Sequence, residues 1–228
     1  SNDNGKNFNI NKKFHEHVCE CCRIPSVWTK EGPIIFWRNI FGKNTRDFAI
    51  SNLEKGEIRR VTNDEWQVDG CPHHGGDIAL GLDNRIHIAW FTLGKTRQGL
   101  FYKHIQGNKE SSPVPIGDPT AQPNHPSIAA SDKNVLVAWR EFDGENVTAN
   151  IMYSTDEGIT WSNQQRIADT KGPSDYPVPL INSEQQMQIF WNTKNEGLKI
   201  IPVDNNINFE ASILNWYTYL KNELANLL

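Results

Sequence analysis

Val135-Leu136-Val137-Ala138-Trp139 is one of four apolar segments that decide the fold, because each ends in tryptophan at the same place in a repeat. The four tryptophans are Trp37, Trp90, Trp139 and Trp191, at intervals of 53, 49 and 52 residues. Each follows another short apolar run and a polar turn, and precedes a third strand-like run. A period of about 50 residues with up to four strands is typical of a β-propeller, one blade per repeat.

The turns inside the repeats agree with this interpretation. Residues 30–32, 83–84, 132–134 and 183–185 are polar, and most contain Gly, Asn or Asp, which accept the backbone angles of tight hairpins. A β-sandwich with coincidental spacing is the alternative, and three nearly equal intervals make it the weaker one. We therefore predict an all-β propeller domain over residues 1–206, with about four recognisable blades.

The last part of the chain has a different pattern. In residues 207–228, apolar side chains such as Ile213, Trp216, Tyr217 and Leu220 recur at helical spacing. This predicts a C-terminal amphipathic helix. Such a helix either caps the last blade or binds a protein partner.

Composition excludes two classes of partner. The chain has 228 residues, with 23 Lys and Arg against 27 Asp and Glu, and a formal net charge of -4. Without a basic surplus, we expect no nucleic-acid partner. No run approaches the ~20 apolar residues of a membrane-spanning helix, so we expect no membrane span.

One turn carries a recognisable motif. Residues 154–161, Ser-Thr-Asp-Glu-Gly-Ile-Thr-Trp, fit the pattern Ser-x-Asp-x-Gly-x-Thr-Trp of the Asp box, also called the bacterial neuraminidase repeat. Residues 1–8, Ser-Asn-Asp-Asn-Gly-Lys-Asn-Phe, are a weaker copy. In this turn the Asp side chain caps backbone N–H groups, Gly supplies a positive φ, and the aromatic residue pins the turn to its blade.

These motifs resemble those of the sialidase-like propeller superfamily. More narrowly, residues 17–22 (His-Val-Cys-Glu-Cys-Cys) and 69–72 (Asp-Gly-Cys-Pro) resemble secreted bacterial propellers labelled exo-α-sialidases. The resemblance implies a secreted, periplasmic or cell-surface protein. It also implies six blades, roughly 300 residues at this period, so we expect either part of a larger ring or a shorter closed one.

Blade geometry brings polar residues to one face. In a blade the first strand begins, and the second strand ends, at the same rim, which we call the mouth and which is where a propeller usually binds its ligand. Ligand-binding candidates there are Arg38, His125 and Asp175. A glycan or another small acidic ligand is the expected partner.

The resemblance also implies a catalytic set. Sialidases grip a carboxylate with three arginines and use a Tyr nucleophile paired with Glu, together with an Asp acid. Arg23 opens the family's Arg-Ile-Pro motif here, and the remaining candidates are Asp47 as acid, Arg97 and Arg140 for the triad, and Tyr176 with Glu141 as the couple. A structural rim arginine is the alternative role for Arg23. Because no second catalytic motif is present, we expect little or no release of sialic acid.

A second cluster consists of cysteines and histidines. Its members are Cys19, Cys21, Cys22, Cys71, His73 and His74. Thiolate and imidazole ligands suit copper or zinc, which would make the chain a non-enzymatic metal-binding or protein-interaction propeller. Disulfides between the first three cysteines and Cys71 are the alternative, and we favour them for an exported protein. No cofactor is expected to be required.

Overall fold

The computed structural model describes residue 1 and residues 3–204; the helix predicted for residues 207–228 lies outside the described residues. The described chain consists of β-strands and two short 3-10 turns, Leu82–Asn84 and Pro119–Ala121. The predicted all-β class is confirmed. Within this part of the chain, no helix has the length and apolar character needed to cross a membrane.

Four antiparallel sheets follow one another along the chain. The first contains β1 (Ser26–Thr29), β2 (Gly32–Phe41), β3 (Thr45–Asn52) and β4 (Ile58–Arg60). The second contains β5 (Asp77–Leu80), β6 (Ile86–Leu93), β7 (Gln98–Gln106), β8 (Lys109–Glu110) and β9 (Val114–Ile116), the last two both pairing with β7. The third contains β10 (Asn124–Ser131), β11 (Asn134–Phe142), β12 (Val147–Ser154) and β13 (Gln165–Thr170). The fourth contains β14 (Val178–Ile181), β15 (Met187–Thr193) and β16 (Gly197–Val203).

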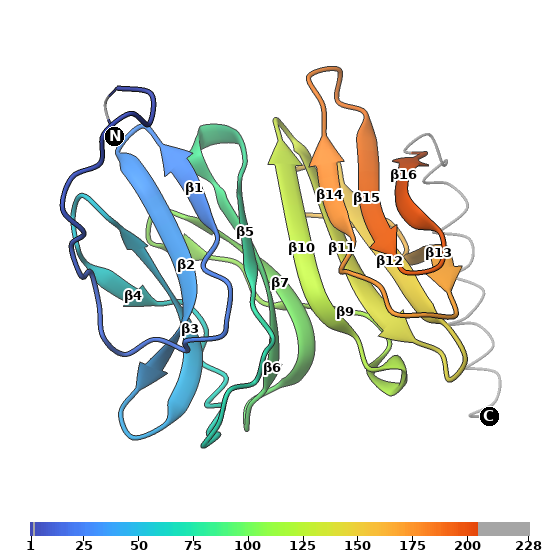
Figure 1. The fold of residues 1–228 in the computed structure, drawn as a ribbon, viewed down its shortest axis with the longest axis horizontal. Helices are drawn as coiled ribbons and strands as arrows, with labels where there is room; N and C mark the ends of the chain where they lie inside the picture. The colour runs from blue at the N-terminus through green and yellow to red at the C-terminus, as the bar shows by residue number, and fades with distance from the viewer. Residues whose placement is uncertain (2, 205–228) are drawn as a thin grey trace, which may run out of the picture.

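The sheets stand side by side through their first strands. β1 packs against β5, β5 against β10, and β10 against β14, while the later strands of each sheet lie farther from this row. Figure 1 shows the resulting arc, from the blue N-terminal sheet to the orange fourth sheet. The first and fourth sheets are the two ends of the arc, so the described residues do not form a closed ring.

The repeated tryptophans lie at equivalent places in the four sheets. Trp37, Trp90, Trp139 and Trp191 lie on β2, β6, β11 and β15, and none is more than 2% exposed. Three apolar clusters fill the spaces between successive sheets, so the second and third sheets bury both faces. The 49–53-residue spacing thus reflects one buried indole in the second strand of each sheet.

Residues 154–161 and residues 1–8 form the same hydrogen-bonded turn. Ser154 Oγ donates to Asp156 Oδ1 at 2.7 Å, and Gly158 N donates to Ser154 Oγ at 2.9 Å. Ser1 Oγ and Asp3 make the equivalent bond at 2.7 Å, and Gly5 N donates to Ser1 Oγ at 2.9 Å. The turn predicted from the motif is therefore present twice.

Candidate functional site

The loops that lead into the first strands converge on Arg23. Its Nε donates to the Gly76 carbonyl at 3.0 Å, its Nη1 to Ser127 Oγ at 3.4 Å, and its Nη2 to the Pro126 carbonyl. The guanidinium carbon lies 4.5 Å from the ring centroid of Tyr176, just before β14. One side chain that precedes β1 thus ties together the entries of all four sheets, which is the structural role considered for it above.

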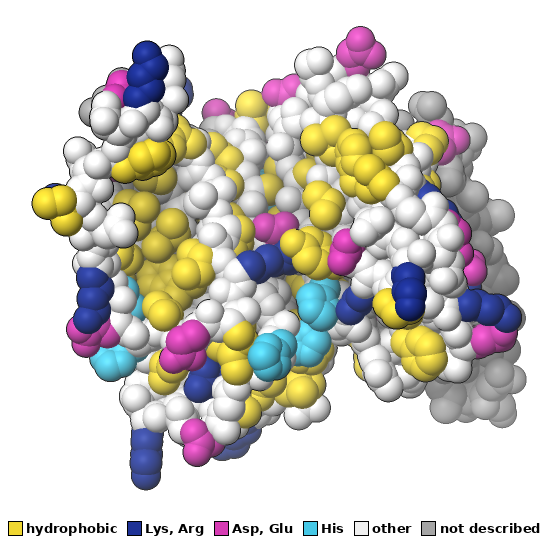
Figure 2. Space-filling view, in the orientation of Figure 1, with side chains coloured by type: hydrophobic (Ala, Val, Ile, Leu, Met, Phe, Trp, Pro, Cys, Tyr) yellow, Lys and Arg dark blue, Asp and Glu magenta, His cyan; other side chains and the backbone are white. Residues whose placement is uncertain are grey.

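Tyr176 begins a row of rings that crosses the mouth. His125 lies parallel to it, with ring centroids 6.3 Å apart, and His74 lies 5.1 Å from His125. Arg140 Nη2 lies 3.4 Å from His125 Nδ1. Figure 2 shows histidine side chains gathered at the hollow between the two halves of the molecule, with Lys or Arg beside them.

Burial and nearby cations keep the two imidazoles neutral. Burial, followed by the charge of Arg140, lowers the pKa of His125 to about 4. The pKa of His74 also falls to about 4, through burial and then through the charges of Arg38 and Arg140. At neutral pH each ring therefore offers one hydrogen-bond donor and one acceptor.

A groove opens beside these rings, between the second and third sheets. Its volume is about 390 Å³. The lining combines apolar and polar side chains, among them His74, Phe91, Leu93, Gln98, Pro123 and Asn124. The His74 ring lies 4.3 Å from the Phe91 ring, so the groove is continuous with the row of rings.

Arg140 and Asp175 complete one side of the mouth. Arg140 Nε donates to Asn124 Oδ1 at 3.3 Å, and Asp175 Oδ2 accepts from Asn192 Nδ2 at 2.9 Å. Burial lowers the pKa of Arg140, and the nearby charge of Asp175 opposes this shift. The structure therefore gathers Arg23, His125, Arg140, Asp175 and Tyr176 from the predicted set.

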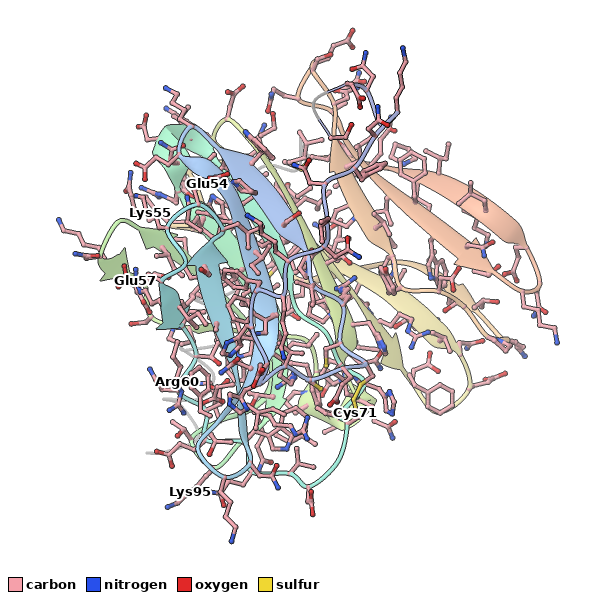
Figure 3. The ribbon with its side chains drawn as sticks, turned by 60° about the vertical axis from the view of Figure 1, so that its left-hand side comes forward. Glu54, Lys55, Glu57, Arg60, Cys71 and Lys95 are labelled. Atoms are coloured by element: carbon pink, nitrogen blue, oxygen red, sulfur yellow. A yellow bond between two sulfur atoms is a disulfide. The ribbon has the colours of Figure 1, made fainter. Side chains whose placement is uncertain are left out.

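Three other predicted catalytic side chains form ion pairs or hydrogen bonds with residues outside this group. Asp47 is fully buried and pairs with Arg60, which is labelled in Figure 3. Arg97 pairs with Asp64. Glu141 accepts from Trp139 Nε1 at 2.7 Å and from the Asp118 backbone N at 2.8 Å. Among the described residues, no hydrogen bond joins Glu141 to Tyr176, so the expected couple is not formed.

Arg38 lies beneath the mouth and does not line it. Only 1% of the residue is exposed, and its guanidinium lies 4.3 Å from the ring of Phe48. Its Nη groups donate to the carbonyls of Arg46, His74 and Phe91 at 2.7–2.9 Å. Burial lowers its pKa, and it cannot reach a ligand.

The cysteines gather as the sequence predicted. Cys21 and Cys71 form a disulfide, visible as a yellow bond beside the Cys71 label in Figure 3. Cys19 and Cys22 are free and buried, and burial raises the pKa of Cys22 to about 11. The contact expected between Cys71 and the first cysteine cluster is confirmed.

The sulfurs fit a soft metal ion better than the imidazoles do. The Sγ atoms of Cys19, Cys21 and Cys71 lie within 4.8 Å of one another, so they could coordinate one ion if the disulfide were reduced. His74 turns its ring toward Phe91 and His125 instead, and His73 is exposed. The copper or zinc site that combined both residue types stays a prediction.

Sequence reasoning overlooked the groove, although a signal was present. Phe91 follows Trp90 directly, as Arg38 follows Trp37 and Arg140 follows Trp139. It therefore occupies the same strand-two exit. An apolar residue at this position in one repeat predicts an apolar wall at the mouth.

Distant structural likenesses agree with the fold. No family model matches the sequence, and no curated protein matches it. An ulvan lyase, a polysaccharide lyase whose structure holds -[GlcA(1-4)Rha3S]-, has 13% identity and a TM-score of 0.50 over 89% of this chain and 57% of its own. A Trypanosoma rangeli sialidase gives 14% identity and a TM-score of 0.48 over 80% and 36%. Aleuria aurantia lectin in complex with Fucalpha1-6GlcNAc gives 14% and 0.40 over 84% and 65%.

Of these three, the ulvan lyase reaches a TM-score of 0.50, and its likeness supports the all-β fold. At 13% identity, this likeness concerns the fold alone. The chain spans between about one third and two thirds of the length of these matched proteins.

Proposed function

We propose that the mouth binds a saccharide and does not cleave it. The observation that carries the proposal is the groove of about 390 Å³ between the second and third sheets, next to the row of rings. Sugar rings present both an apolar face and hydroxyl groups, and sites that bind small ligands combine apolar walls with a few placed polar groups. Phe91 and Pro123 supply such walls, while Gln98 and Asn124 supply polar groups.

The neutral histidines suit hydroxyl ligands. The pKa values of His74 and His125 are both about 4, so both rings are neutral at neutral pH. His125 Nδ1 lies 2.6 Å from Asn124 Oδ1, which leaves its Nε2 for a ligand. Tyr176 is 36% exposed at the other end of the row and offers a further aromatic surface. The acidic saccharide in the ulvan lyase structure is the kind of ligand that the positive charge of Arg140 would favour.

Binding without cleavage is favoured because three of the candidate catalytic side chains are held by partners of their own. Asp47 pairs with Arg60, and Arg97 pairs with Asp64. Glu141 accepts the indole N–H of Trp139. A general acid or base must be within reach of the bound substrate, and none of these three carboxylate and guanidinium groups is exposed at the groove.

Binding can be tested on an array of immobilised neutral and uronic-acid oligosaccharides, followed by titration calorimetry with any that is retained. Leu93 is 50% exposed and Gln98 is exposed, so Leu93→Asp and Gln98→Ala should leave the fold intact. We expect Gln98→Ala to weaken binding about tenfold, about 1.4 kcal/mol, by removing a polar contact. Leu93→Asp should weaken it further by placing a charge on an apolar wall.

Leu198→Asp is the matched control, because Leu198 is 64% exposed on β16, in the fourth sheet. It should leave affinity unchanged. Retention of no saccharide, or equal affinity in the groove variants and the control, would remove the proposal.

A further inference from the structure

Four sulfur atoms meet beside the mouth in an arrangement that saccharide binding does not use. Cys21 and Cys71 form a disulfide, and the Sγ of the free Cys19 lies 3.4 Å from Cys71 Sγ. The Sγ of the free Cys22 donates to Cys19 Sγ at 3.2 Å. A free sulfur against a disulfide sulfur, with a second free sulfur behind it, is the arrangement that thiol–disulfide exchange requires.

The backbone fixes this Cys-x-x-Cys pair. Cys19 N donates to the Arg38 carbonyl on β2 at 3.0 Å, and Cys22 N donates back to the Cys19 carbonyl at 3.3 Å. The turn buries both side chains, which are 2% and 6% exposed. Cys21, between them, is exposed. Two thiols are thus held inside, and one sulfur of the disulfide faces solvent.

A buried cation accompanies the two free cysteines. The Arg38 guanidinium donates to three carbonyls, and its Nε has no partner. Its charge acts on the sulfurs of Cys22 and Cys19. No carboxylate forms an ion pair with Arg38 in the described part of the chain, since Asp47 pairs with Arg60. Arg38 is therefore a buried cation beside the two free sulfurs, and Asp47 is a further charged group that acts on it.

We propose that this cluster is a thiol–disulfide exchange site in which the Cys19/Cys22 pair moves the disulfide from the surface into the interior. Cys19 Sγ, as thiolate, attacks Cys71 Sγ. The Cys19–Cys71 bond forms, the Cys21–Cys71 bond breaks, and the electron pair leaves on Cys21, which takes up the proton that Cys19 released. Cys22 then loses its proton and attacks Cys19, which forms Cys19–Cys22 and releases Cys71 to be protonated.

The two steps need no external oxidant, because one disulfide and two thiols are present before and after. Their result is an exposed thiol at Cys21 beside a partly exposed thiol at Cys71. Such a dithiol can reduce a disulfide of another protein, and the return reaction re-forms the surface disulfide. The class of partner is therefore a protein with an accessible disulfide or dithiol.

Disulfide mapping of the full chain tests the proposal. The protein is reduced completely, oxidised with one equivalent of diamide, trapped at intervals with N-ethylmaleimide, and analysed by peptide mass spectrometry. We expect two interconverting forms, one with Cys21–Cys71 and one with Cys19–Cys22 and label on Cys21 and Cys71. Cys22→Ser should stop at Cys19–Cys71, with label on Cys21.

Cys19→Ser is the matched variant, since it removes the attacking sulfur and leaves the surface disulfide. It should lock Cys21–Cys71 and reduce the labelling of Cys21 to background. If wild type and Cys22→Ser show the same locked pattern as Cys19→Ser, the proposal is wrong. Stoichiometric zinc or copper that protects all four reduced thiols from the label would also overturn it, in favour of a metal centre.

Discussion

Residues 154–161 and residues 1–8 form the same turn in two different settings. Their internal hydrogen bonds match within about 0.2 Å where the two copies share donors and acceptors. The later copy is docked, with the Trp161 ring 4.5 Å from the Tyr102 ring of the second sheet. In the earlier copy, Phe8 is 78% exposed.

The difference separates local from tertiary causes. The side-chain caps and the positive φ of the glycine (79° at Gly158, 82° at Gly5) suffice to form the turn. Docking needs a partner surface, which Tyr102 provides only to the later copy. The turn is therefore a local structure, and its contribution to global stability depends on what lies beside it.

The largest expected effect comes from replacing the glycine of each turn, Gly158 or Gly5, by alanine. A Cβ on Gly158 would lie 1.9 Å from Tyr102 Oη, whereas a Cβ on Gly5 would meet nothing within 4 Å. Tyr102 cannot move aside easily, since it is fully buried and its hydroxyl lies 2.7 Å from His87 Nδ1. Gly158→Ala should therefore lower the free energy of unfolding by about 3 kcal/mol, measured by urea denaturation.

Gly5→Ala is the matched control for backbone strain, because its φ is nearly the same. We expect it to change the free energy of unfolding by less than about 0.5 kcal/mol, because this turn is not docked. Equal losses in the two variants would mean that strain alone dominates, and that docking contributes nothing.

A smaller effect concerns His87, beneath the docked turn. It is fully buried, and burial, followed by the charges of His104 and Arg85, lowers its pKa to about 3. Between about pH 3 and pH 6.5 the unfolded chain binds a proton at this residue that the folded chain does not. Stability is therefore complete above about pH 6.5 and falls as the pH falls through this window.

At about pH 4.5 the loss of unfolding free energy caused by His87 should reach about 2 to 3 kcal/mol. Urea denaturation at about pH 7.5 and pH 4.5 measures it as the extra loss of wild type over His87→Gln. His74 and His125 titrate in the same window and remain in both proteins, so they cancel. An unchanged pH dependence in His87→Gln would contradict the assignment.

Much of the architecture could be predicted, because the residues that repeat along the sequence are buried core residues. Each tryptophan lies in the second strand of its sheet, so its spacing reveals the period directly. The arc of four sheets follows from that period. Closure into a ring could not be predicted, since it depends on contacts between sheets distant in sequence.

The site was less predictable, because position at a rim does not determine what a side chain contacts. Arg23 and Tyr176 meet as blade geometry suggested, at 4.5 Å. Glu141 occupies the same rim, but its carboxylate accepts a hydrogen bond from the indole N–H of Trp139, two residues earlier. Asn39 does the same for Trp37 at 3.1 Å, so the residue two places after the tryptophan has a structural role in both repeats.

The smallest expected effect tests whether the undocked turn forms in solution. A hydrogen bond from Ser1 Oγ, followed by bonds from the backbone and side chain of Asn7, lowers the pKa of Asp3 to about 2. NMR titration of the side-chain carboxyl carbons should therefore find Asp3 still ionised well below its usual range, and Ser1→Ala should raise its pKa. Asp143, whose pKa is held at about 2 by backbone N–H groups of Asn146 and Glu145, is the internal reference and should not move. An ordinary pKa for Asp3 in wild type would show that the turn needs docking to form, and the contrast between the two copies would then be one of folding and not of packing alone.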